Sequence, residues 1–180
     1  IALCRLDDEL DGAGHTYVVG AELSRAATEV KERLRGLLEH RIPAVRQAAM
    51  RLCALAGDVD AITVLLDVMD DPVAVDRGIA MVAAFGAAAN AVLRTAAPRV
   101  APSQREQYFR LIGALPSGRV DPQLLECLTT GLGEQGEDAA VAAAESLSSV
   151  GDRTSLAPLY RAMAHDGRLG ESAADAVAAI

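Results

Sequence analysis

Apolar and charged residues alternate at the helical period in the segment from about residue 21 to residue 41. Apolar side chains fall on one face of a helix, and charged side chains fill the opposite face. The apolar positions are Leu23, Ala27, Val30, Leu34, Leu37 and Leu38. The pattern predicts a long amphipathic helix with one buried face and one face in water.

Proline, glycine and aspartate divide the following sequence into pairs of helices. Pro43 is expected to begin a helix that ends at Gly57, because proline suits the first turn and glycine readily adopts the left-handed conformation at a helix end. A shorter helix over about residues 60–69 follows, with Asp58 or Asp60 expected to cap it. Similar signals predict helices over residues 73–85, 88–97, 103–115, 122–132, 138–150 and 154–164.

Other capping signals support these boundaries. The Asp-Pro pairs at residues 71–72 and 121–122 each place a capping carboxylate before a proline at the first helical position. Ser103 and Glu106 fit a capping box, in which each side chain bonds the backbone of the other residue. Helix starts are therefore expected at these three places.

The helix pairs repeat. Residues 48–58 and 142–152 both form a small-residue helix ending in Gly-Asp, and Pro43, Pro72 and Pro102 lie 29 and 30 positions apart. Self-similarity with a period of roughly 20–50 residues is typical of a solenoid. We predict an all-α fold, an α-solenoid (α-α superhelix) of about five antiparallel helix pairs plus a truncated sixth.

Two groups of residues carry a family resemblance. One is residues 45–49 followed by residues 55–58, and the other is residues 142–145 followed by Leu147 and residues 150–152. They resemble HEAT repeats, in particular the short bacterial type found in phycobilisome lyase proteins. The resemblance covers residues 43–180 and extends to residues 1–42 as a degenerate first repeat. It implies one repeat domain over residues 1–180 with a binding or scaffolding role, and it does not imply lyase activity, because the motif is a packing pattern.

Composition fits thin layers of helices. The chain of 180 residues is 51% apolar but only 3% aromatic, and alanine lets helices approach closely. Stacking buries the apolar face of each pair, and the second helices are expected to form a shallow concave binding surface. Because the sequence starts at Ile1 and stops within a repeat at Ile180, we expect a piece of a longer protein. Weak self-association through the open C-terminal repeat is a further expectation.

Net charge, the length of uncharged stretches and the spacing of cysteines argue against several classes of protein. A net charge of −8 without a basic cluster argues against nucleic-acid binding. The longest uncharged stretch, 16 residues between Arg77 and Arg94, is too short to span a membrane. Three cysteines, Cys4, Cys53 and Cys127, lie far apart, which indicates reduced thiols in a cytoplasmic protein.

We found no pattern that predicts covalent chemistry. None of His15, His40 and His165 has metal-ligand spacing to another ligand, and the acidic cluster at residues 7–11 does not fit a calcium loop. No nucleophile motif or phosphate loop occurs. We therefore predict no catalytic residue, no metal and no cofactor.

Aspartates border the helix expected over residues 60–69, which carries no lysine or arginine. If this helix faces the concave side, Asp60, Asp67 and Asp70 would attract a partner with a basic surface. The alternative is a solvated face with helix caps at its two ends.

The leading functional hypothesis is a non-enzymatic scaffold or adaptor that binds another protein. The alternative is a bilin-lyase-like enzyme or enzyme subunit with a chromophore in the concave groove, which would need a pocket with convergent polar groups. A HEAT-like DNA glycosylase ranks last, because it would need a basic groove with aromatic side chains.

Overall fold

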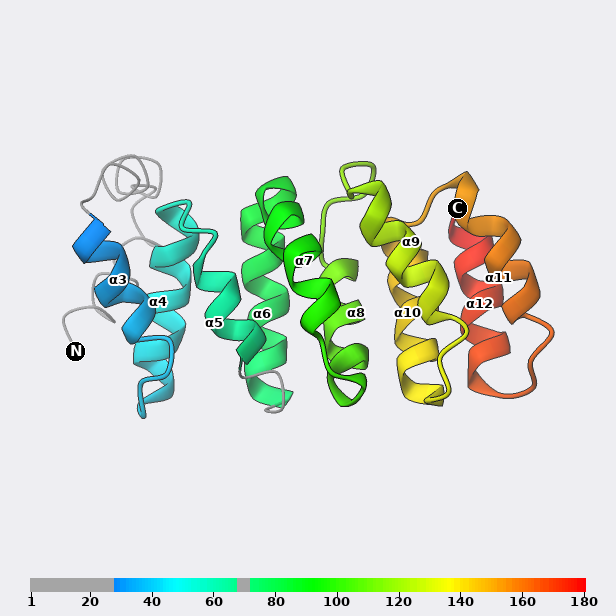
Figure 1. Cartoon of the computed structure of the whole chain (residues 1–180), viewed down its shortest axis with the longest axis horizontal. Helices are drawn as coiled ribbons and strands as arrows, with labels where there is room; N and C mark the ends of the chain where they lie inside the picture. The colour runs from blue at the N-terminus through cyan, green and yellow to red at the C-terminus, as the bar shows by residue number, and fades with distance from the viewer. Residues whose placement is uncertain (1–27, 68–71) are drawn as a thin grey trace. The chain divides into compact units, whose positions relative to one another are not determined.

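The computed structural model describes residues 28–67 and 72–180. These residues form α-helices, short 3-10 helices and connecting turns, and no strand occurs within either range. The predicted all-α class is confirmed. The chain divides into two compact units, unit 1 (residues 1–68) and unit 2 (residues 69–180), and Figure 1 labels the helices of both.

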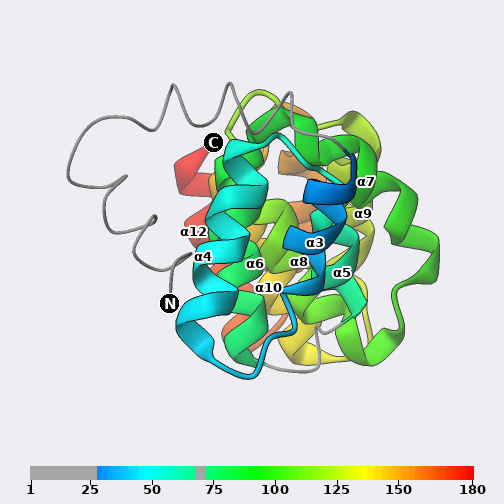
Figure 2. The same ribbon diagram turned by 90° about the vertical axis from the view of Figure 1, so that its left-hand side faces the viewer.

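Unit 1 contains a helix followed by a helical pair. The helices are α3 (Thr28–Gly36), α4 (Pro43–Leu55) and α5 (Ala61–Asp67). Helix α3 packs against α4 (Figure 2), and Leu34, Leu52 and Cys53 are buried in this unit. Val30 was predicted to be buried but is 42% exposed. It lies one turn before Leu34, in the first turn of the described helix, where less of α3 is covered.

The turn between α4 and α5 confirms the glycine prediction and corrects one capping prediction. Gly57 has a left-handed φ of +63° and lies two residues after the last residue of α4, Leu55. The Asp58 carboxylate does not cap α5. It is buried and accepts hydrogen bonds from Nε and Nη2 of Arg35, both at 2.7 Å. Helix α5 instead begins with the Ala61 N–H donating to the backbone carbonyl of Asp58 at 3.0 Å.

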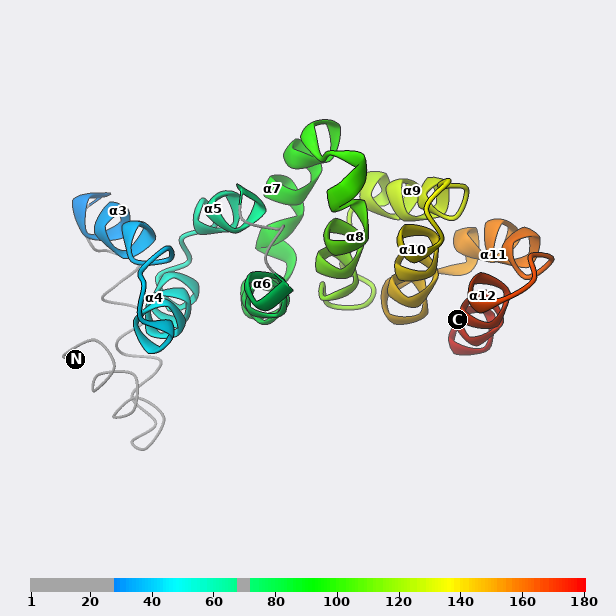
Figure 3. The same ribbon diagram turned by 90° about the horizontal axis from the view of Figure 1, so that it is seen from below.

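Unit 2 consists of two layers of helices. Helices α6, α8, α10 and α12 form one layer, and helices α7, α9 and α11, which we call the second helices, form the other (Figure 3). The helix bounds are α6 Pro72–Phe85, α7 Ala89–Ala96, α8 Arg105–Gly113, α9 Pro122–Gly131, α10 Glu137–Val150, α11 Leu156–Ala162 and α12 Arg168–Ala179. Consecutive hairpins therefore stack side by side within this unit, as in a solenoid.

The described residues account for most of the predicted repeats. In chain order, four predicted pairs are occupied by α4 and α5, α6 and α7, α8 and α9, and α10 and α11, while α12 is half of a further pair. The closest packing between the two layers joins α9 to α10 and α11 to α12. Helix α3 corresponds to the second helix of the degenerate first repeat, and the segment before residue 28 lies outside the described residues. The protein is thus a helical repeat protein, with the pairs near the predicted positions.

Helix α10 lies at the centre of unit 2, against α8 and α12. Its inward side chains are small, and Ala140, Ala143 and Ala144 are almost completely buried. A Cβ added to Gly113 of α8 would lie 2.7 Å from Oγ and 3.1 Å from Cα of Ser146. The Ser146 hydroxyl also donates to the Phe109 carbonyl at 2.8 Å. Small residues therefore set the close approach of these helices, as the composition predicted.

Of two helix caps predicted in unit 2, one is confirmed and the other is wrong. Asp121 caps α9 as predicted, since its carboxylate accepts from the Gln123 N–H at 2.9 Å and Pro122 follows at the first position. The capping box at Ser103 is wrong. Pro102 begins a 3-10 turn at residues 102–104, so Ser103 is already inside helical structure and α8 begins without a side-chain cap.

The second Gly-Asp motif is used differently from the first. Gly151 follows α10 with a φ of −63°, so it does not need the left-handed region. A Cβ there would lie 2.4 Å from the Leu147 carbonyl oxygen. Asp152 accepts from the N–H and hydroxyl of Thr154, and these bonds lower the pKa of its carboxyl. The glycine is required by space rather than by its φ angle.

Replacing Gly113 with alanine is expected to destabilise unit 2 by about 1–3 kcal/mol, because the new methyl group would overlap the backbone and side chain of Ser146. Urea unfolding followed by circular dichroism measures this change. Gly133→Ala is the matched control, since its Cβ would make only an ordinary 3.5 Å contact with the Thr130 carbonyl. An equal effect of both substitutions would contradict the packing argument.

Candidate binding face on the second helices

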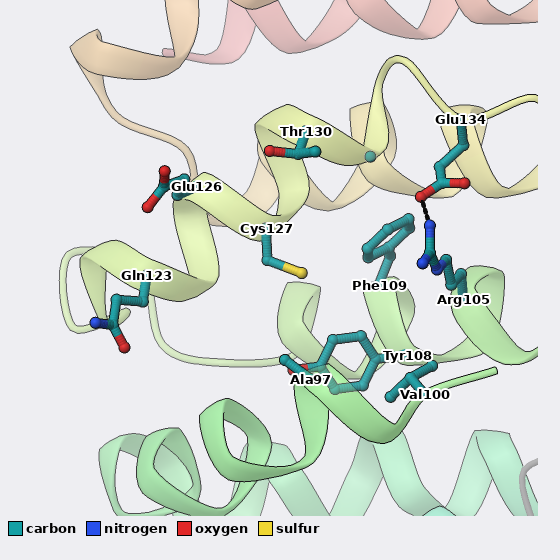
Figure 4. Close-up of a pocket in the computed structure, with 11 residues that line it drawn as sticks. Ala97, Val100, Arg105, Tyr108, Phe109, Gln123, Glu126, Cys127, Thr130 and Glu134 are labelled. Carbon is teal, nitrogen blue, oxygen red and sulfur yellow. Dashed lines mark hydrogen bonds and ion pairs between the residues drawn. The ribbon is translucent and has the colours of Figure 1, made fainter. Parts of the chain in front are cut away.

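Two adjoining hollows open beside α9, and we define them first. Hollow A has a volume of about 320 Å³ and lies among the end of α7, α8 and α9 (Figure 4). Hollow B has a volume of about 210 Å³ and lies between α9 and α11. Thr130, an exposed residue of α9, lines both hollows. The face of the second helices in unit 2 therefore carries two neighbouring depressions.

The apolar floor of hollow A comes from α8 and its neighbours. Tyr108 and Phe109 are adjacent in sequence, and their ring centroids are 6.3 Å apart at a tilt of 52°. The apolar lining consists of Ala97, Val100, Tyr108, Phe109, Cys127 and Gly131. Figure 4 shows the Cys127 sulfur and the two rings turned toward the same space. Such a floor favours contact with an apolar side chain of a ligand.

Several polar groups of hollow A already have partners within the protein. The Tyr108 hydroxyl donates to the Leu93 carbonyl at 2.7 Å, and burial raises the pKa of this hydroxyl. Arg105 forms an ion pair with Glu134 at the rim of the hollow (Figure 4). Gln123, Glu126 and Thr130 also line hollow A and are exposed. An occupant would meet an apolar floor and a mostly acidic rim.

Hollow B has a different character. Thr129, Thr130 and Gly133 of α9 and its following turn line one side, and the C-terminal part of α11 lines the other. Arg161 near the end of α11 and His165 three residues after that helix contribute the side chains that can carry positive charge. Neither aspartate nor glutamate lines this hollow, in contrast to hollow A.

Of the predicted partner-binding aspartates, Asp60 is the one whose side chain the structure describes, and it belongs to unit 1. The Asp60 carboxylate is 68% exposed and accepts from Arg35 Nη2 at 3.0 Å. Arg35 thus bridges Asp60 and the buried Asp58, and the hydrogen bond that Arg35 donates to Asp58 is the main cause of the raised pKa of Arg35. The side chain of Asp67, and Asp70 altogether, lie outside the described residues. Near Asp60, the arginine partly neutralises the predicted acidic face.

The searched part of the chain contains no group of metal-binding side chains. Residues 28–67 and 72–180 hold no cluster of three or more histidine, cysteine, aspartate or glutamate residues suited to a metal ion. In the same ranges, no helix has the length and apolar character needed to cross a bilayer. Of the histidines, His40 accepts from the Ile42 N–H at 3.2 Å, His165 lines hollow B, and His15 lies outside the described residues.

Comparison with known proteins adds little to this description. No protein-family model matches the chain, and no curated protein matches it. Among solved structures, the chain is similar to a designed armadillo repeat protein with 14% identity and a TM-score of 0.45. That alignment covers 98% of this chain and 99% of the designed protein. The description of the fold therefore rests on the helices of this chain.

The sequence contained weak signals for the hollows. Aromatic residues are rare in this chain, at 3%, and two of them are adjacent at Tyr108 and Phe109. However, no local pattern predicts that Arg105 would meet Glu134, because these residues lie 29 positions apart. The hollows arise from side chains of different repeats.

The two described cysteines are expected to differ in reactivity, because only Cys127 lines a hollow. Cys53 is completely buried, and burial raises the pKa of its thiol to about 12. Burial also raises the pKa of the Cys127 thiol, although the Arg105 charge opposes this effect. At pH 8, iodoacetamide should therefore modify Cys127 in the folded chain and Cys53 only after unfolding in urea. Peptide mapping by mass spectrometry distinguishes the sites, and equal modification rates in the folded chain would contradict the assignment.

Proposed function

We propose that this chain is a non-enzymatic protein-interaction module whose partner binds the face of the second helices in unit 2. One observation carries the proposal: hollows A and B adjoin each other across Thr130 on one face. An apolar depression rimmed by polar side chains is the usual form of a site that anchors a protein segment. A scaffold or adaptor role follows from such a face on a stack of helical hairpins.

The finer identity of the repeats also remains our proposal. The HEAT-like assignment is supported by the burial of Ala48 and Ala49 in α4 and of the corresponding small residues Ala142–Ala144 in α10. These are positions at which the motif requires close packing. We further propose a reducing, cytoplasmic compartment, supported by the free thiols of Cys53 and Cys127. A bacterial source is proposed from the resemblance to the short bacterial type of HEAT repeat.

The chromophore-binding alternative receives less support from hollow A. A volume of about 320 Å³ is near the lower end of the range of small-molecule pockets, which is roughly 300–1,000 Å³. A chromophore site also needs polar groups that converge on the ligand. In hollow A, the Tyr108 hydroxyl and the Arg105 guanidinium are directed to partners within the protein.

Two earlier hypotheses about partners stay predictions. Weak self-association through the last repeat would involve three exposed apolar side chains: Tyr160 of α11, Met163 directly after α11, and Ile180 directly after α12. The acidic border of α5 would attract a basic partner through Asp60, Asp67 and Asp70.

Charge reversal at Asp67 and Asp70 to lysine is expected to weaken binding of a basic partner and to reduce the salt dependence of its affinity, because two attractive charges become repulsive. Isothermal titration at two ionic strengths measures both effects. Asp166→Lys provides a control at an exposed acidic residue of unit 2. If affinity and salt dependence are unchanged by the double reversal, the acidic border has no binding role.

Thr130→Trp is expected to abolish binding of proteins that dock on the second helices, because a bulky side chain would occupy the ridge shared by both hollows. Thr130 is exposed, so the substitution should cost less than about 0.5 kcal/mol of stability. Affinity capture from cells of the source organism, compared quantitatively between wild type and variant, measures the loss.

Ser149→Trp is the matched control for this experiment. Ser149 is an exposed hydroxyl residue of α10, which belongs to the other helix layer. The Ser149→Trp variant should capture the same proteins as the wild type. If Thr130→Trp retains every captured protein, the second-helix face is not the binding surface and the proposed function fails.

A further inference from the structure

Arg161 lines hollow B and, like Arg99, Arg119 and Arg153, forms no ion pair among the described residues of unit 2. Its Nε donates at 3.4 Å to the Ala157 carbonyl of the same helix. In the described part of the chain, no ion pair joins Arg161 to a carboxylate. By contrast, the arginines at positions 94, 105, 110 and 168 pair with Asp121, Glu134, Asp76 and Asp138, respectively. The guanidinium of Arg161 is exposed beside His165 and is available to a ligand.

The two hollows differ in charge, and this difference determines which ligand group each can bind. Arg105 neutralises Glu134 in hollow A and leaves the charge of Glu126 uncompensated, so hollow A does not attract an acidic group. Hollow B has Arg161 and His165 and no acidic residue among its lining. An apolar group therefore fits hollow A, and an acidic group fits hollow B.

The helix between the hollows sets the spacing of these groups. Hollows A and B lie on the two sides of α9 and share Thr130. Packed helices are about 8–10 Å apart, so a ligand that crosses one helix spans roughly this distance. An extended peptide advances about 3.3 Å per residue, and about three residues therefore connect one hollow to the next.

We propose that unit 2 binds an extended peptide segment that crosses α9, with a large apolar side chain in hollow A and an aspartate or glutamate about three residues away in hollow B. The apolar side chain contacts Val100 and Cys127 above the two aromatic rings. The carboxylate pairs with the guanidinium of Arg161 and lies beside His165. This inference rests on the proposed function and specifies the chemistry of the partner.

A displayed library of random 12-residue peptides tests the specificity with the complete chain as bait. Selected peptides should be enriched in a large apolar residue and an acidic residue about three positions apart. Selection on Thr130→Trp should lose these peptides, and selection on Ser149→Trp should keep them. Peptides that depend on Thr130 but show no acidic preference would overturn this inference and leave the proposed function intact.

A charge exchange tests the contact with Arg161. In fluorescence polarisation with a selected peptide, Arg161→Glu should weaken binding roughly three- to fivefold, as expected for an exposed ion pair. Changing the peptide acid to lysine should restore affinity for Arg161→Glu and weaken binding to the wild type. Arg153→Glu is the control, because Arg153 is an exposed arginine that lines neither hollow. Equal effects of the two substitutions, or no recovery with the lysine peptide, would overturn the proposal.

Alkylation provides an independent readout for hollow A. The selected peptide should protect Cys127 from iodoacetamide, and prior modification of Cys127 should weaken peptide binding. If no peptide is selected in a manner that depends on Thr130, the proposed function itself fails. If peptides are selected but leave the alkylation rate of Cys127 unchanged, the apolar side chain does not bind in hollow A. That result overturns this inference and leaves the proposed function intact.

Discussion

Close contact between helices, made possible by glycine and alanine, is the constraint on which unit 2 depends. A Cβ on Gly131 would lie 2.6 Å from Cζ of Phe109 and 3.1 Å from Cβ of Ala143, so one small residue lets α9 meet both α8 and α10. Because protein interiors are densely packed, adding even a methyl group there would force helices or rings to move. The same contact fixes Phe109 at the floor of hollow A. The packing of the repeat and the shape of the candidate site therefore have one cause.

Polar contacts between repeats mainly fix how neighbouring helices are aligned with one another. Asp76–Arg110 and Asp138–Arg168 connect neighbouring helices of one layer, but these ion pairs are largely exposed and therefore contribute little to stability. Asn90 does more for the architecture, because its amide donates to two backbone carbonyls and its oxygen accepts from the Asp121 N–H. It thereby attaches α7 to the segment that begins α9. Buried apolar area supplies most of the stability, and these contacts select one alignment of the helices.

Equivalent motifs in a repeat protein can have different structural roles, as the two Gly-Asp pairs show. Asp58 is buried and holds Arg35, whereas Asp152 is exposed and caps a 3-10 turn. The difference comes from the neighbouring element, since only the first aspartate has an arginine of a preceding helix within reach. The same reasoning applies to the hollows. Their function depends on which side chains of successive repeats come together, so a repeat motif alone does not specify the ligand.

The sequence by itself determined the helical class, the pairing of helices and several of their boundaries. Pro43, Gly57 and Asp121 succeeded as signals because each acts on backbone atoms within one helical turn. Tertiary structure alone decided that Asp58 would bind Arg35, that Ser146 would reach Phe109, and that two hollows would flank Thr130. The first two contacts join residues 23 and 37 positions apart, and the lining of each hollow comes from more than one helix. Such contacts depend on how far the helices approach each other, which small residues at distant positions set together.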